Sequence, residues 1–182
     1  MNFPRLLVFL AAVIVTFAAQ PSRVRAETPT AEQIKPPFNL EWGESSDRLD
    51  RLLKGAKAQV IEKREVEGRE AWTVEGLLQA GLKRTVFYFR DGQLVEVELQ
   101  YQSNDWDSAK YDDFMAQVRR RIEQRFGNGQ LIARTKAPEG KVMQTVVGYK
   151  WNLNNTAIQL FYYSAETSTE SYRTVSVHYK TL

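Results

Sequence analysis

The chain has 182 residues, with 25 Lys and Arg against 22 Asp and Glu, one His and no Cys. The lack of Cys excludes disulfides, thiolate metal sites, Cys nucleophiles and a lipid-bearing Cys, and a single His excludes a multi-His metal centre within one chain. Arg5, Arg23 and Arg25 lie in the first 26 residues, which hold no acid, so the rest of the chain has 22 bases and 22 acids. A neutral domain has no broad field that attracts polyphosphate, and we therefore expect no nucleic-acid partner.

The N-terminus has the pattern of an export signal. Arg5 precedes an apolar run at residues 6–19, whose length fits a signal peptide and is short for a membrane span, which needs about 20 residues. Val24-Arg25-Ala26 predicts cleavage after Ala26, so residues 1–26 are interpreted as the signal peptide. Cleavage after Ala19 and an uncleaved anchor are the alternatives. We expect an exported protein, periplasmic or extracellular, with no integral membrane span after cleavage.

Residues 27–37 are polar and contain Pro, with Ile34 as the one apolar side chain apart from Ala, and this composition predicts a flexible linker. The folded domain is expected over residues 38–182. Alternation predicts a short strand at residues 38–43. Ser45 or Ser46 then caps a helix that reaches about Ala56, with Leu49, Leu52 and Leu53 on its apolar stripe. Strands are predicted after it at residues 59–66, 70–75, 83–90 and 93–101, the last two joined by a tight Asp91-Gly92 turn.

The second half repeats this order of elements. A helix is predicted over residues 105–126, where six apolar side chains recur at the three-and-four spacing of a core-facing stripe: Tyr111, Phe114, Met115, Val118, Ile122 and Phe126. Strands are predicted at residues 131–135, 142–153, 156–164 and 173–180. The fold class expected is α+β, built of two helix-plus-antiparallel-strand units at residues 38–103 and 104–182. Short connections between strands predict that the helices pack on one face of an antiparallel sheet.

The first unit resembles a known group of small exported proteins. A strand ending in Trp42-Gly43, a Ser-capped helix over residues 45–56 with Leu-Leu before Gly55, and a meander of strands look like the units of β-lactamase-inhibitor-like proteins. Small outer-membrane assembly lipoproteins of the SmpA/OmlA type share that unit. The resemblance covers the order of elements over residues 38–182 and rests on short motifs. This chain differs in having no lipobox Cys and in showing the helix-start motif clearly once. The resemblance implies non-enzymatic binding of a protein partner on an open sheet face.

The residues that bear on catalysis favour a structural interpretation. His178 is the one imidazole base, and alternation places it outward beside Ser176 and Lys180, as a solvated surface His rather than a member of a Ser-His-Asp site. Glu96 and Glu98 share one strand face at a spacing that paired-carboxylate hydrolysis can use, but alternating acids are ordinary on a wet face.

An acidic cluster at residues 105–113 resembles a cation-binding loop. The places that a calcium loop fills with Gly and an acid hold Lys110 and Ala116, so these acids are interpreted as helix-entry residues. No metal and no cofactor are expected.

Two groups of residues are predicted to bind a partner. Alternation places Tyr88, Phe161 and Tyr163 on the face opposite to the core, where neighbouring exposed aromatic side chains indicate an interaction surface. A covering loop or linker, or a strand register shifted by one residue, is the alternative. The same alternation assigns to the core Phe87, Phe89, Tyr149, Trp151 and Tyr162.

The second group belongs to the densest basic cluster, at residues 119–125. Within it Arg120 and Arg121 either complement the helix dipole or contact an anionic surface, such as a lipid head group or an acidic partner.

These patterns favour a secreted or periplasmic, non-enzymatic binding protein. It would act through a sheet face or loops on an envelope protein or another extracytoplasmic macromolecule. The alternatives are an exported hydrolase with a carboxylate site between the two units and a purely structural envelope protein.

Overall fold

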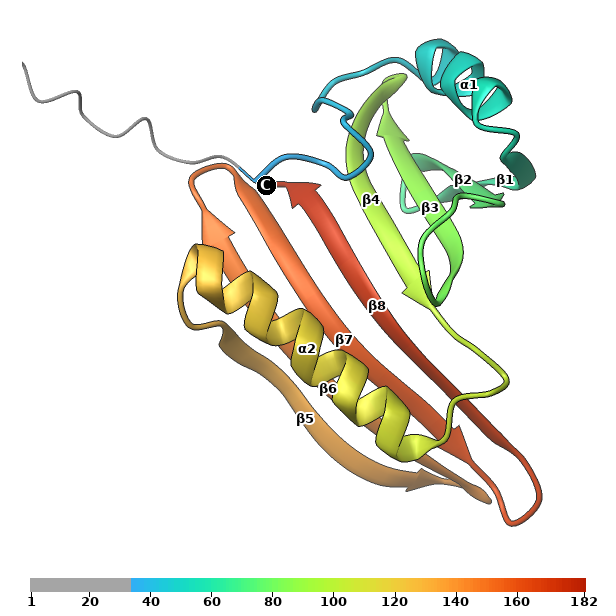
Figure 1. The fold of residues 1–182 in the computed structure, drawn as a ribbon, viewed down its shortest axis with the longest axis vertical. Helices are drawn as coiled ribbons and strands as arrows, with labels where there is room; N and C mark the ends of the chain where they lie inside the picture. The colour runs from blue at the N-terminus through green and yellow to red at the C-terminus, as the bar shows by residue number, and fades with distance from the viewer. Residues whose placement is uncertain (1–33) are drawn as a thin grey trace, which may run out of the picture. The chain divides into compact units, whose positions relative to one another are not determined.

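The computed structural model describes residues 34–182, which form an α+β fold (Figure 1). The predicted signal peptide and the first part of the predicted linker lie outside the described residues. Within residues 34–182 the helices are α1 (Ser46–Gly55) and α2 (Ser108–Phe126). The strands are β1 (Gln59–Val66), β2 (Arg69–Glu75), β3 (Leu82–Arg90), β4 (Gln93–Tyr101), β5 (Gln130–Glu139), β6 (Val142–Leu153), β7 (Thr156–Glu166) and β8 (Ser171–Thr181).

The eight described strands form one antiparallel sheet in the order β1-β2-β3-β4-β8-β7-β6-β5. Each half of the domain is a helix followed by four strands, and the halves meet where β4 pairs with β8. Strand β8, the last of the eight along the chain, lies between β4 and β7 and pairs with both. The sheet is therefore continuous across the two halves.

Local sequence signals explain the elements that match the prediction. Ser45 is the N-cap of α1 and accepts a hydrogen bond from the backbone N–H of Arg48 at 3.3 Å. Leu49 and Leu53 of α1 are buried, whereas Leu52, predicted to share their stripe, is 46% exposed. Asp91 and Gly92 both have positive φ, as a two-residue hairpin turn between β3 and β4 requires.

The predicted strand at residues 38–43 is wrong. Phe38 and Asn39 have φ of 64° and 57°, which is the left-handed region and incompatible with extended backbone. The segment is held by the Trp42 indole N–H, which donates to the carbonyl of Ile34 at 2.8 Å. Ile34 itself is 1% exposed within the core, so the linker interpretation is wrong for residues 34–37, which pack on the domain.

The main core lies on one side of the sheet, called here the core face. Val97, Tyr179, Ile158 and Trp151 are successive partners across β4, β8, β7 and β6, and all belong to one apolar cluster. The same cluster contains Leu49 and Leu53 of α1 and three residues of α2, namely Tyr111, Met115 and Ile122. Helix α2 packs against β7 and β8 (Figure 1). The opposite side of the sheet is called the outer face.

A bulge in β4 changes which side chains reach each face. Tyr88 pairs with Glu96 and Phe89 pairs with Leu94, which leaves Val95 without a partner in β3. Simple alternation predicts that Val95 shares the face of Val97, and this is wrong, because the extra residue turns Val95 toward the outer face. There it packs against a second, smaller apolar cluster of Ala71, Val86 and Tyr88.

Candidate binding site on the outer face of the sheet

A group of polar side chains lies on the outer face where the two halves of the sheet join. The register places Glu98 of β4 opposite His178 of β8, and Gln100 opposite Ser176. We call the hydrogen-bonded set around them the junction network: Arg69, Tyr88, Glu96, Glu98, Gln100, Ser176 and His178. It brings together residues from β2, β3, β4 and β8.

Glu96 is the centre of the junction network. One carboxylate oxygen accepts from Arg69 Nη1 at 2.6 Å, and the other lies 2.8 Å from Nδ1 of His178. Burial acts to raise the pKa of Glu96, but the hydrogen bonds and charges of His178 and Arg69 outweigh it and hold the pKa below its usual value. Glu96 is therefore ionised at neutral pH and accepts hydrogen bonds, so Nδ1 of His178 donates.

The second ring nitrogen of His178 faces a hydroxyl and another acid. Nε2 lies 3.2 Å from Oγ of Ser176 and 3.7 Å from Oε1 of Glu98. In the neutral ring Nε2 has no proton, so Ser176 donates to it, which gives the order Ser–His–carboxylate. The interpretation of His178 as a solvated surface residue is wrong, since its side chain is 19% exposed. Glu96 is likewise buried, and the Glu98 side chain is only 12% exposed, so neither lies on a wet face.

Tyr88 has a structural role in this network. Its hydroxyl donates to Glu98 at 2.9 Å, and the Arg69 guanidinium lies 4.7 Å from the centre of its ring. Burial, together with the charge of Glu98, raises the pKa of Tyr88. The prediction that Tyr88 lies opposite to the core aromatic residues is correct, but Tyr88 is 9% exposed, so the prediction that it contacts a partner is not supported by its position.

Phe161 and Tyr163 lie on the outer face of β7, beside the junction network. The Phe161 ring meets the His178 ring edge-on at 5.7 Å. It also covers Gly148 of β6, where an added Cβ would lie 2.5 Å from the ring. The Tyr163 ring is 6.1 Å from that of Tyr172, which is 47% exposed. We call Phe161, Tyr163 and Tyr172 the aromatic patch.

Tyr172 was missed by the sequence analysis, which began the last strand at residue 173. Strand β8 begins at Ser171, and Tyr172 continues the outward alternation of Thr174, Ser176 and His178. Extending that alternation by two residues would have found Tyr172, since nothing in the intervening sequence breaks a strand.

Arg120 and Arg121 lie apart from the aromatic patch. Both are exposed on α2, which packs against β7 and β8 through side chains of the core-face cluster. Their neighbour Arg119 is held by Glu123 at 2.8 Å and by the Tyr149 hydroxyl at 2.9 Å. The two predicted binding groups therefore belong to two different surfaces.

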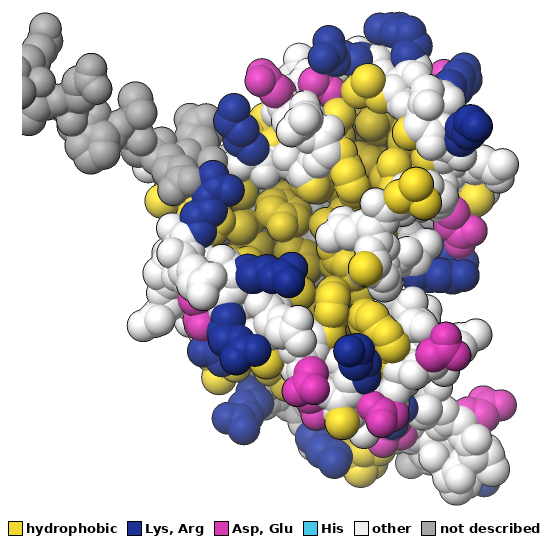
Figure 2. All heavy atoms as spheres, in the orientation of Figure 1, with side chains coloured by type: hydrophobic (Ala, Val, Ile, Leu, Met, Phe, Trp, Pro, Cys, Tyr) yellow, Lys and Arg dark blue, Asp and Glu magenta, His cyan; other side chains and the backbone are white. Residues whose placement is uncertain are grey.

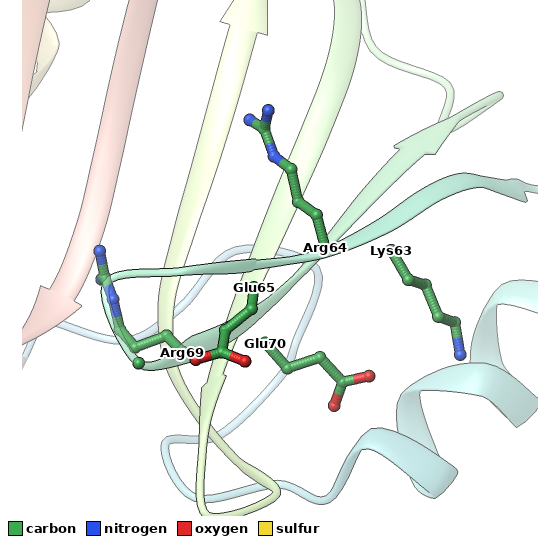
Figure 3. Close-up of a pocket in the computed structure, with 6 residues that line it drawn as sticks. Lys63, Arg64, Glu65, Arg69 and Glu70 are labelled. Atoms are coloured by element: carbon green, nitrogen blue, oxygen red, sulfur yellow. The ribbon is translucent and has the colours of Figure 1, made fainter.

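A hollow of about 460 Å³ lies at the β1–β2 hairpin, close to one end of the junction network (Figure 3). Figure 3 shows Arg64 pointing away from the side on which Lys63, Glu65 and Glu70 lie. The Lys63 ammonium lies over the Trp72 ring at 3.4 Å, and Arg69 is paired with Glu96. Charges of both signs line this hollow, so it offers no uniform field for a charged ligand.

The described residues contain neither a group of metal ligands nor a membrane-spanning helix. In residues 34–182 no three His, Asp or Glu side chains are grouped so that they could hold a metal ion. No helix in that range combines the length and the apolar character needed to cross a bilayer. Comparisons with protein-family models, with curated proteins and with solved structures found no match.

Proposed function

We propose that this chain is an exported, non-enzymatic binding protein whose aromatic patch binds a macromolecule of the cell envelope. In this proposal both helices cover the core face, and the outer face of β6, β7 and β8 meets the partner. The single observation that carries it is the position of Phe161, held between Gly148 and His178 and followed by Tyr163 and Tyr172. Export rests on the sequence of residues 1–26, and the periplasm is the compartment proposed.

Fixed aromatic side chains favour binding because little side-chain entropy remains to be lost. Phe161 is restricted by Gly148 below and by the His178 ring at its edge, while His178 is held in turn by Glu96. Aromatic side chains are over-represented among the residues that contribute most to protein interfaces. The junction network borders the aromatic patch, and its hydrogen bonds are already formed in the free protein. Binding therefore does not have to order these polar side chains.

The test is capture of envelope proteins by the native chain and by surface variants. Tyr163→Ala and Tyr172→Ala should each reduce the captured partner at least about tenfold, as interface hot spots do, without lowering the melting temperature. Leu131→Ala is the matched control, because Leu131 is a 47% exposed apolar side chain on the edge strand β5. Loss of the partner in the Leu131 variant as well, or retention in both Tyr variants, would remove the aromatic patch as the binding surface.

A hydrolase is the second candidate, and one observation favours it. Ser176, His178 and Glu96 lie in the order and at the distances of a nucleophile, a general base and an orienting carboxylate, at the junction of the two halves. In such a reaction His178 Nε2 takes the proton as Ser176 Oγ attacks a carbonyl carbon. The backbone of β8 is paired on both sides, so its N–H groups are engaged in the sheet rather than arranged as an oxyanion hole.

Covalent labelling with a fluorophosphonate separates the two candidates. A hydrolase should be labelled at Ser176, and both Ser176→Ala and His178→Ala should abolish the labelling. A binding protein should remain unlabelled under conditions in which it still captures its partner. Labelling that survives in Ser176→Ala would show that the reactive group is elsewhere.

A further inference from the structure

A groove with an apolar floor and a basic rim lies on the core-face side of the domain, separate from the aromatic patch. Its volume is about 340 Å³. Figure 2 shows apolar side chains exposed in a hollow between the segment that leads to α1 and the end of α2, with Lys and Arg side chains beside it. Ten residues line the groove: Ile34, Lys35, Pro36, Pro37, Arg121, Ile122, Arg125, Phe126, Ile158 and Tyr179.

One wall of the groove is fixed in place. The Ile34 side chain is 1% exposed, and its carbonyl accepts the Trp42 indole hydrogen bond at 2.8 Å. Pro36 and Pro37 follow, and their rings restrict the backbone between Ile34 and the turn at Phe38. The opposite wall is the last turns of α2, and the floor is Ile158 of β7 and Tyr179 of β8. The groove is thus formed before a ligand arrives.

The charged side chains that line the groove are all basic. Lys35, Arg121 and Arg125 line it, and none of the ten lining residues is acidic. Burial raises the pKa of Tyr179, although Arg125 acts in the opposite direction, so this phenol is neutral at pH 7 and adds no negative charge. In a domain whose mature charges balance, Lys35 and Arg121 beside an apolar floor form a local field for one anionic group.

Helix geometry separates these arginines from the rest of the basic cluster. Arg121 and Arg125 are one turn apart on α2 and therefore lie on the same side of the helix. Arg119 and Arg120 line a different hollow of about 250 Å³, together with Asp112 and Glu123, where both signs of charge are present. The cluster at residues 119–125 therefore borders two different hollows, and acidic residues line only the one beside Arg119 and Arg120.

We propose that the groove between residues 34–37 and the end of α2 binds an amphipathic carboxylate, such as a medium-chain fatty acid. The acyl chain lies on the floor formed by Ile158 and Tyr179, against Phe126 of the α2 wall, and the carboxylate lies beside Lys35 and Arg121. The volume is at the lower end of the range of small-molecule sites, about 300–1,000 Å³. An anion with an apolar tail can pair with the basic side chains of the rim and also cover the apolar floor. A wholly polar anion would leave the floor exposed to water.

The test is calorimetric titration of the chain, purified as its host produces it, with sodium decanoate below its micelle concentration. Three other probes accompany it: acetate, which keeps the head group alone; decyltrimethylammonium, which keeps the tail and reverses the charge; and an acidic peptide. We expect saturable binding of decanoate that weakens as salt is added, because half-exposed ion pairs are screened. Acetate, the cationic amphiphile and the peptide should bind at least about tenfold more weakly.

Two variants localise the site. Arg121→Gln should weaken decanoate binding about tenfold, the effect of losing one charge-assisted contact. Arg120→Gln is the matched control, one residue away on the same helix and outside the groove, and should leave the affinity within about twofold. Circular dichroism checks that both variants fold.

Four outcomes would overturn the proposal: no saturable decanoate binding, equal binding of acetate or of the cationic amphiphile, preferred binding of the acidic peptide, or equal losses in the Arg120 and Arg121 variants. The third outcome would assign the groove to a protein partner. Because the aromatic patch is on the other face, none of these outcomes affects the proposed envelope binding.

Discussion

The outer face of the sheet is buried in one half of the domain and accessible in the other. On β2 and β3 its side chains are closed off, with Ala71 at 0%, Val86 at 2% and Tyr88 at 9% exposure. On β7 the corresponding positions hold Phe161 and Tyr163, which are half-buried, and Tyr172 beside them on β8 is exposed. The outer face of this one sheet is therefore buried on the β2–β3 side of the β4–β8 junction, where it stabilises the fold. On the β7 side of the junction the outer face is accessible.

This difference shows that a polar strand face is not necessarily a wet one. In the first half a small apolar cluster and the junction network cover each other, because Arg69 lies over Tyr88 and reaches Glu96. Substitutions there should change the free energy of unfolding. In the second half, substitutions of the accessible side chains Tyr163 and Tyr172 should change binding and leave stability nearly intact.

The largest effect is expected at Glu96. Glu96→Ala removes the buried acid that pairs with Arg69, leaving it only the exposed Glu67 at 3.3 Å, and it also removes the acceptor of His178 Nδ1. It should lower the free energy of unfolding by about 3 kcal/mol in urea titrations. Glu166→Ala is the matched control, since Glu166 pairs with Arg173 at 2.5 Å but is 41% exposed. Glu166→Ala should lower the free energy of unfolding by less than about 1 kcal/mol. Equal losses would contradict the contrast between the halves.

Gly148 gives the next largest effect. In Gly148→Ala the new Cβ would be 2.5 Å from the Phe161 ring, which must move, so we expect a loss of about 1–3 kcal/mol in unfolding free energy. Gly55→Ala in α1, where nothing lies within 4 Å, should be neutral or stabilising. The double variant Gly148→Ala/Phe161→Ala should lose less than the sum of its single variants. An additive result would show that the ring does not rest on Gly148.

Lowering the pH should remove the contribution of Glu96, in the first half, to the free energy of unfolding. The folded pKa of Glu96 lies below its unfolded value of 4.5, so its contribution to stability is fully present above that value and is lost as the pH falls through the folded pKa. The difference in unfolding free energy between native protein and Glu96→Ala should therefore shrink from pH 7 to pH 3. A difference that stays constant over this range would show that the Glu96 charge is not what stabilises the fold.

A matched pair of tyrosines gives the smallest effects. Tyr88→Phe removes a buried hydrogen bond to Glu98 and should lower the unfolding free energy by about 1–2 kcal/mol. Tyr163→Phe on the accessible side should change it by less than about 0.5 kcal/mol. Thermal unfolding of the two variants side by side measures the contrast, and the reverse ranking would place Tyr163 rather than Tyr88 in the stabilising network.

Local signals in the sequence were sufficient for much of the fold. Ser45 caps α1 and Asp91-Gly92 turns between β3 and β4, because each acts on neighbouring backbone alone. The core aromatic side chains are also assigned correctly, since Phe87 and Trp151 follow strand alternation. The bulge at Val95 has no equivalent local signal, and it is where the alternation of β4 fails.

The candidate site depends on contacts between distant parts of the chain. Glu96 bonds to Arg69, 27 residues away, and to His178, 82 residues away. Alternation correctly places Glu96 and His178 on one face, but it contains no information on which side chains from other strands cover them. The groove beside α2 was missed for the same reason, because Ile34 and Pro37 reach it from a segment whose composition predicts a linker.

The place of β8 in the sheet has a consequence for how the molecule is assembled. Strands β1 to β4 are consecutive along the chain and can pair with one another before the rest of the chain folds. One edge of β4 stays unpaired until then, because its partner on that side is the eleven-residue strand β8 (Ser171–Thr181). An unpaired edge invites pairing with other chains until its own partner arrives. Strand β8, the last of the described strands along the chain, thus closes the gap between the two halves of the sheet.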